Sequence, residues 1–315
     1  MRSWDLLAAE FNLLRREGVV IAVLVGFMVT VLAAGFAGRA AIEDRRITAE
    51  AALQEYRQLV ESLANQAAAG SDTARSAGAV AFSVLSVPVV KAQTALEALA
   101  IGQGDLLADT YFVTARGAYH FLTRTDPDNA LRFTVGSFDV AFLLIWVLPL
   151  LVIGVLFDVV VGERDRGVLA LAAVAGASPA RFVWHKWCAR VLVLGVSCWI
   201  SIVLAAAVAE TYWTATTAWV ITGWLLVATV YLLFWAALAL WISLRASTTE
   251  SAAMQCAGAW LLLVVLTPAL TNVGASSVVP PPSRVELTAA LREATEQADK
   301  QIASEREQWF FDHPD

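Results

Sequence analysis

Charged residues are scarce in this chain. Only 16% of its 315 residues are Asp, Glu, Lys or Arg, whereas about a quarter are charged in a typical soluble domain. Hydrophobic residues make up 58%, the mean hydropathy is +0.64, and the apolar residues are clustered rather than spread. The sequence therefore excludes an ordinary soluble domain and predicts an integral membrane protein.

Cysteine and the common catalytic motifs are also scarce or missing. The three cysteines lie in or beside apolar runs, so we expect neither a disulfide framework nor a thiolate metal site. The sequence has no GxxxxGK[ST], HExxH, GxSxG or GxGxxG motif, and its three histidines are far apart. We expect no enzyme site, no cofactor and no metal in this chain, and no nucleic-acid partner.

The apolar runs lack ionisable side chains at membrane depth, apart from cysteine. Carriers driven by protons or sodium ions need carboxylates or basic groups inside the membrane. The absence of such groups argues against an ion-driven carrier. If the protein moves a substrate, the energy comes from another source.

Five apolar runs are long enough to cross a bilayer at about 20 residues each. We predict spans at 18–38, 138–161, 190–210, 218–244 and 251–273, the last containing Pro268. Residues 1–17 are predicted to form an N-terminal helix that carries acids. The first run is therefore read as an uncleaved signal anchor, although Ala-rich positions near Ala34–Ala41 leave cleavage open.

The distribution of basic residues predicts the orientation. The segment 162–188, with Arg190 just beyond it, is rich in Arg and Lys, whereas the turn 210–217 has neither. Basic short loops stay in the cytoplasm. We therefore expect a multi-pass protein with a cytoplasmic N-terminus, an extracytoplasmic segment at 39–136 and another at 275–315.

Both extracytoplasmic segments are predicted to be helical, so the fold class is an all-α integral membrane protein. Residues 39–69 show apolar positions at helical spacing, and a second helix is expected over Val80–Ile101, interrupted near Pro88. The turn 125–130 has strong turn chemistry. After the extended stretch 278–284, the sequence predicts a charged helix.

The cytoplasmic segment 162–188 carries the most specific motif. Glu163-Arg164-Asp165-Arg166-Gly167-Val168-Leu169 resembles the E-[KR]-E-[KR]-G-T-L signature that follows the second span in ABC-2-type transporter permeases. Asp165 stands where Glu is commoner, and Val168 stands where Thr is usual. As in that family, a Pro-containing break and an R…K…R pattern follow, here Pro179, Arg181, Lys186 and Arg190.

Further motifs resemble the DUF3526-type branch of this family, which is related to the NosY-like permeases. That branch has large external segments between spans one and two and after span five. The matching stretches are Ile101–Leu106, Gly136–Asp139, Pro149–Leu151, Pro282–Arg284 and Asp312–Pro314. The family normally continues to a sixth span, so we expect that the C-terminal part is absent, whether or not Asp315 is the natural end.

The resemblance implies a permease subunit without its own ATPase site, in a bacterial inner membrane. A separate P-loop ATPase would bind ATP and grip a short coupling helix, driving substrate export or membrane remodelling. A second permease subunit, identical or related, would complete the assembly in the lipid bilayer. The residues implied in coupling are Glu163, Arg164, Asp165, Arg166, Gly167, Leu169, Leu171 and Pro179.

Two alternatives stay open on the sequence alone. The charges at 163–166 would orient the segment at the membrane surface or pair with the ATPase, while Gly176 and Pro179 would end the helix. Alternatively, the charges merely cap an interfacial helix. At the level of the whole chain, the alternative is a membrane anchor or sensor, not a transporter, whose external helices bind a partner.

Overall fold

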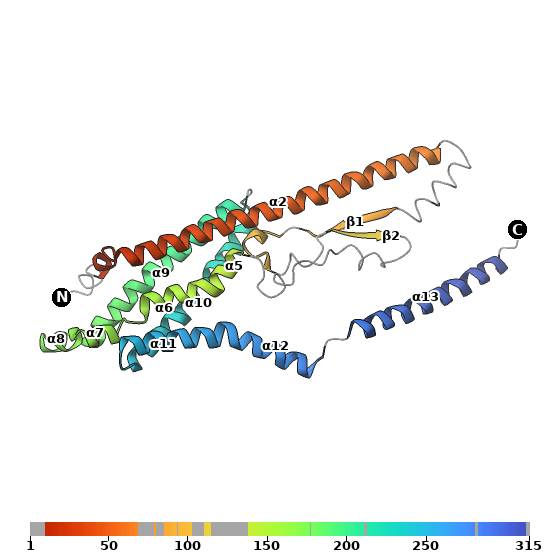
Figure 1. Cartoon of the computed structure of the whole chain (residues 1–315). Coiled ribbons are helices and arrows are strands. Elements are labelled where there is room, and N and C mark those ends of the chain that lie inside the picture. The colour runs from red at the N-terminus through yellow and green to blue at the C-terminus, as the bar shows by residue number, and fades with distance from the viewer. Residues whose placement is uncertain are drawn as a thin grey trace. The chain divides into compact units, whose positions relative to one another are not determined.

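The computed structural model describes residues 10–68, 79, 85–92, 94–102, 110–114, 138–176, 178–210, 213–280 and 283–312. The chain divides into two compact units, Met1–Trp260 and Leu261–Asp315. The first unit holds nearly all of the elements that position the candidate site (Figure 1).

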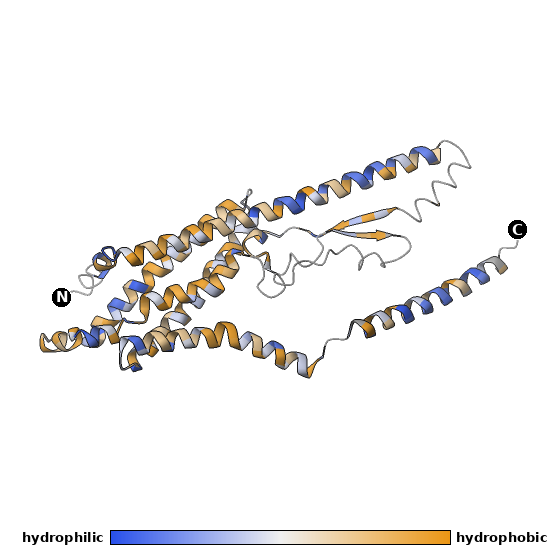
Figure 2. Cartoon of the chain, viewed as in Figure 1, coloured by the Kyte–Doolittle hydropathy of each residue, from blue (hydrophilic) through white to orange (hydrophobic). Residues whose placement is uncertain are grey.

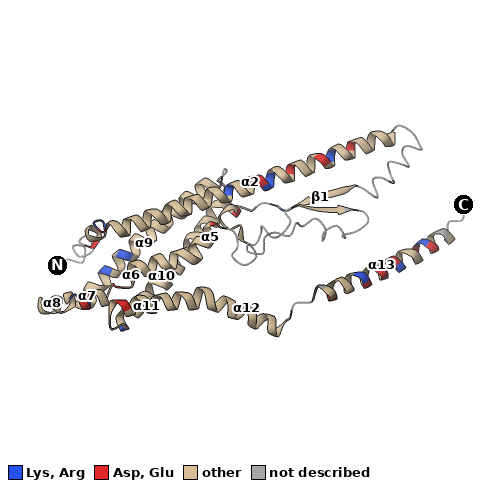
Figure 3. Cartoon of the chain, in the orientation of Figure 1, with Lys and Arg blue, Asp and Glu red and all other residues tan. Residues whose placement is uncertain are grey.

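Five helices are long and apolar enough to cross a membrane, as the sequence predicts. They are Gly18–Ala68, Val140–Asp165, Pro179–Ala209, Ala215–Arg245 and Thr249–Val278. Figure 2 shows apolar residues over most of these helices. Figure 3 shows that Lys, Arg, Asp and Glu gather toward the helix ends and in the distal part of the first helix. The protein is an all-α integral membrane protein with very little sheet.

The first helix, α2 (Gly18–Ala68), is 51 residues long. It contains both the predicted span and the predicted external helix, and no break separates them. Its residues 39–68 carry charged side chains, whereas residues 18–38 carry none. The helix over 39–69 is thus confirmed, but its fusion with the span was not anticipated, because Gly38 reads equally well as a helix end.

Small residues bring α2 close to α9 (Pro179–Ala209). Ala34, Gly35 and Gly38 are buried, and a Cβ on Gly35 would lie 3.2 Å from Ala205. Small residues at this spacing let helix backbones approach closely, which is how helices associate in lipid. The backbones of α2 and α9 therefore approach closely at Gly35 and Ala205.

A pair of short antiparallel strands replaces part of the predicted second helix. β1 (Ser86–Val90) pairs antiparallel with β2 (Thr110–Thr114), and Pro88 lies opposite Phe112. The Val-rich sequence SVPVV favours a strand, and Pro88 removes the N–H that a helix would need. The helix expected over Val80–Ile101 is therefore wrong at 86–90. The predicted turn at 125–130 lies outside the described residues.

The single turn η1 (Glu97–Leu99) fixes the external segment against α2. Leu96 and Leu99 are buried, and the Leu96 N–H donates to Glu210 at the end of α9. Burial alone would raise the pKa of Glu97, but hydrogen bonds from Lys91 and Thr94 and the charge of Arg45 outweigh it and lower the pKa. The turn thus joins α2 to the C-terminal end of α9.

Span two contains a π-helical segment, η4 (Leu143–Val147), between α5 (Val140–Phe142) and α6 (Leu148–Leu156). The backbone N–H of Leu148 donates to the carbonyl of Leu143. Pro149 has no N–H that could donate to the carbonyl of Ile145. The hydroxyl of Tyr231, from α10 (Ala215–Arg245), donates to the Ile145 carbonyl at 3.0 Å. A side chain from span four thus replaces a backbone bond that proline removes.

Span five has the same order of elements: a helix, a π-helical segment and a second helix with a proline near its start. It consists of α11 (Thr249–Trp260), the π-helical η5 (Leu261–Leu266) and α12 (Thr267–Val278), and Pro268 follows the π segment at the same offset as Pro149. The second unit then continues with α13 (Arg284–Asp312), the charged helix that the sequence predicts.

Substituting Gly38 tests the docking of η1. A Cβ at this position would overlap the carbonyl of Ala98, so we expect Gly38→Ala to lower the stability by about 1–3 kcal/mol. Thermal unfolding in detergent measures the effect. Gly26→Ala is the matched control, because a Cβ there meets nothing within 4 Å. Equal melting temperatures for the two variants would contradict this packing.

Tyr231→Phe tests the bond to the Ile145 carbonyl. Loss of the hydroxyl leaves that carbonyl without its donor, and we expect a loss of about 1 kcal/mol in the free energy of unfolding. Pro149→Ala supplies a new N–H in span two and should reduce the loss in the double variant. Additive effects of the two substitutions, measured by thermal unfolding, would speak against the shared carbonyl.

Candidate functional site

The charged segment after span two folds as two short helices. α6 ends at Leu156, and α7 (Val161–Asp165) and α8 (Val168–Val174) follow. Gly167 separates them with φ +73°, a left-handed conformation that glycine adopts without strain. The motif residues 163–166 thus lie in and directly after α7, and Gly167 divides the segment.

The end of α8 differs in part from the prediction. Gly176, with φ +76°, follows α8 as expected. Pro179 instead begins α9, where Ser178 caps the helix by accepting from the N–H of Arg181. Proline at the first position of a helix costs no hydrogen bond, which explains why it starts α9 rather than ending α8.

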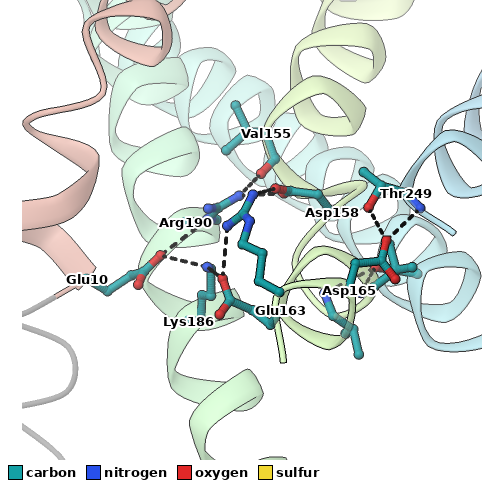
Figure 4. A network of polar contacts seen from close by, with 12 residues as sticks. Glu10, Val155, Asp158, Glu163, Asp165, Lys186, Arg190 and Thr249 are labelled. Carbon is teal, nitrogen blue, oxygen red and sulfur yellow. Dashed lines mark hydrogen bonds and ion pairs between the residues drawn. The ribbon is translucent and has the colours of Figure 1, made fainter. Parts of the chain in front are cut away.

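A buried cluster of ion pairs joins α7 to α9 and to the N-terminal segment (Figure 4). Lys186 lies 2.5 Å from Glu163 and 3.9 Å from Glu10, which belongs to the short helical stretch 10–14. Arg190 lies 3.4 Å from Glu10 and 3.0 Å from Asp158. All of these side chains except Asp158 are less than a tenth exposed.

Arg166 completes the cluster at its edge. Its guanidinium lies 3.4 Å from Glu163 and 3.6 Å from Asp158, and its side chain is 62% exposed. Three carboxylates therefore face three basic groups. This balance matters because burying a charge costs several kcal/mol unless a partner compensates it.

The other two motif charges connect α7 to the turn between spans four and five. Arg164 donates to the carbonyls of Ala246 and Leu244 at 3.0 and 3.1 Å. Asp165 accepts from the N–H and hydroxyl of Thr249, at the start of α11. These four bonds fix α7 to the end of α10 and the start of α11.

Ser243 of α10 caps α7 from the same side. Its hydroxyl oxygen accepts from the N–H groups of Val160 and Val161 at 3.1 and 3.2 Å, and the residue is fully buried. These N–H groups lie at the start of α7, where the helix itself offers them no acceptor. With the ion cluster, α7 is bonded to α9, α10 and α11, and α9 in turn is bonded to Glu10 of the N-terminal segment.

The motif residues therefore serve contacts within the chain. Glu163 was predicted to orient the segment or pair with the ATPase, but it is 6% exposed and points at Lys186. Glu10 and Asp158 complete the cluster, and sequence reasoning assigned neither to the site. The sequence offered one signal for Glu10 and Asp158: their charge is opposite to that of Lys186 and Arg190.

α8 presents a different surface. Leu169 is partly buried against Val159, Val160 and Val183. Leu171, which was predicted in the site, is 70% exposed, and Val174, which was not, is 87% exposed. α8 thus leaves two large apolar side chains exposed, although α7 beside it is bonded to neighbouring helices.

A second polar contact joins two of the external motifs. The carboxylate of Asp139 accepts from the N–H of Gly102 at 2.9 Å and from that of Phe142 at 2.7 Å, capping α5. Gly102 has φ +54°. The motif stretches Ile101–Leu106 and Gly136–Asp139 thus meet, through Gly102 and Asp139, at the start of span two. Gln103, Asp105, Gly136 and Ser137 lie outside the described residues.

Replacing Lys186 tests the ion cluster. Lys186→Met leaves Glu163 and Glu10 buried without their shared cation, so we expect a loss of about 3–5 kcal/mol in the free energy of unfolding. Glu163→Gln in the same chain should recover part of it. Thermal unfolding is the measurement, with the exposed Arg57→Met as control. A loss no larger than that of the control would show that the cluster contributes little.

Comparison with protein families identifies the family of the chain. The family model of the ABC-2 family transporter protein matches residues 4–294, which include all five spans and the whole of the charged segment. Among curated proteins, no sequence matches the chain significantly. Since the match covers well over half of the chain, the protein belongs to the ABC-2 transporter family.

Proposed function

We propose that this chain is the permease subunit of an ABC transporter and that a separate ATPase subunit docks on α8. One observation carries the docking site: α7 is bonded to α9, α10 and α11, while α8 beside it exposes Leu171 and Val174. Exposed apolar side chains of this size mark contact surfaces.

The geometry gives a physical route for coupling. ATP would bind to the partner, and closure of the partner would displace α8. Because α7 is bonded through Glu163 to α9 and through Asp165 to α11, its displacement would move both spans as rigid bodies. Gly167 would set the angle between the docking helix and the bonded helix.

Location and assembly follow the same proposal. The basic segment that contains α7 and α8 would face the cytoplasm of a bacterial cell, together with the N-terminus, in the inner membrane. A second permease subunit, identical or related, would complete the transporter. The contact between Gly102 and Asp139 supports the DUF3526-type branch, because it gives two of that branch's motifs one structural role. The substrate, and the choice between export and membrane remodelling, stay unassigned.

The docking surface is tested by placing charge on α8. Leu171→Glu with Val174→Glu should remove the partner ATPase from the complex, because both side chains are exposed and their replacement leaves the bonds of α7 intact. The measurement is a pull-down from native membranes with a tagged chain, reading the co-purified ATPase by mass. Ile47→Glu, at an exposed apolar position of α2, is the control.

Three results are informative. Loss of a stoichiometric P-loop ATPase in the double variant alone supports the docking site. Retention of the ATPase in the double variant contradicts it. Recovery of the wild-type chain with no ATPase contradicts the permease function itself and favours the anchor or sensor alternative.

A further inference from the structure

A cleft lies between the start of α9 and the end of α10, beside α7 and α8. Its volume is about 350 Å³, and its lining is mainly apolar, including Val160, Leu169, Val183, Leu240 and Leu244. Both long helices are membrane spans, and the cleft is at their charged ends. It therefore lies at the level where spans leave the apolar core of the bilayer.

One arginine lines this cleft, and two more are adjacent in sequence to its lining residues. Arg164 lines it, and its bonds to two backbone carbonyls hold the guanidinium in place while using two of its five donors. Arg181 follows the lining residue Ala180, and Arg245 follows Leu244. The nearby carboxylate of Asp165 is bonded to Thr249. Arg164 thus places a positive charge in the lining, and Arg181 and Arg245 add positive charge at the same ends of α9 and α10, so an anion is the ligand that we expect here.

Each long helix also places an indole at this end. Trp184 lines the cleft and is 55% exposed, stacking on Trp187 with ring centres 5.1 Å apart. Trp241 is 51% exposed, and the guanidinium of Arg245 lies 4.2 Å above its ring. Exposed Trp beside Arg is typical of the headgroup level of a bilayer.

We propose that this cleft binds an anionic phospholipid of the surrounding bilayer. The phosphate would lie among Arg164, Arg181 and Arg245, and the first part of an acyl chain along Val183 and Leu240. Basic pockets between membrane helices bind anionic headgroups by this chemistry. A soluble partner is a poorer fit, because the walls of the cleft are the ends of apolar spans. The proposal needs no ATPase, so it stands or falls independently of the proposed function.

Binding to the purified full chain tests the proposal. Native mass spectrometry in detergent measures the affinity for dioleoyl phosphatidylglycerol and for dioleoyl phosphatidylcholine, which share acyl chains. We expect wild type to prefer phosphatidylglycerol, and Arg181→Gln with Arg245→Gln to lose about fivefold in that affinity per arginine. Ala180→Glu, which adds a carboxylate at an exposed lining position, should lower it too.

The matched control is Arg57→Gln, which removes the same charge from an exposed position on α2. Melting temperatures confirm that the variants fold. Equal affinities for the two lipids, unchanged binding in the double variant, or equal loss in the control would overturn the proposal. Full competition by inorganic phosphate would reduce the cleft to a simple anion site. Loss of a co-purified ATPase in Ala180→Glu with phosphatidylglycerol binding intact would assign the cleft to the protein partner.

Discussion

Two cations one helical turn apart on α9 constrain much of the fold. Lys186 and Arg190 are buried, and each needs carboxylates close by, because an uncompensated buried charge is costly. The carboxylates come from three places in the chain: Glu10 before span one, Asp158 at the end of span two, and Glu163 in α7. The cluster thus determines where the N-terminal segment and α7 lie relative to span three (Figure 4). Moving one of these segments away from α9 would leave a buried carboxylate without its cation, which is costly.

The same constraint governs the backbone. In a bilayer every N–H and C=O needs a partner within the protein. Where a span is interrupted, a side chain from another element supplies it: Tyr231 for the Ile145 carbonyl, Ser243 for the N–H groups that open α7, and Asp139 for those at the start of span two. Breaks in the spans are consequently also the places where helices are connected. Proline and π-helical turns, which would weaken an isolated helix, here fix neighbouring helices to one another.

The sequence predicts the spans well, because an uncharged apolar run of some 20 residues is rarely compatible with any environment except the bilayer core. It does not predict the directions of side chains in the charged segment. Glu163 and Arg166 are three residues apart in one motif, yet one is buried and the other 62% exposed, since Lys186 and Arg190 lie on one side only. The sequence also does not identify Glu10, because its contact with α9 depends on how the N-terminal segment folds back against that helix. The strand pair was missed because SVPVV was read for helical spacing, and Pro88 was treated as an interruption rather than as evidence for a strand.

Gly167 separates two short helices with different surroundings within the segment from Val161 to Val174. On its N-terminal side, α7 has its polar groups bonded to neighbouring helices. On its C-terminal side, α8 packs through Leu169 on Val159, Val160 and Val183, while Leu171 and Val174 are exposed. A force applied to α8 would therefore reach span three by two paths, through Leu169 on the apolar side and through Glu163 on the charged side. The first path includes the wall of the basic cleft. A lipid in that cleft, as proposed, would contact Leu169 and Val183 of the apolar path, whereas Glu163 of the ion cluster does not line the cleft.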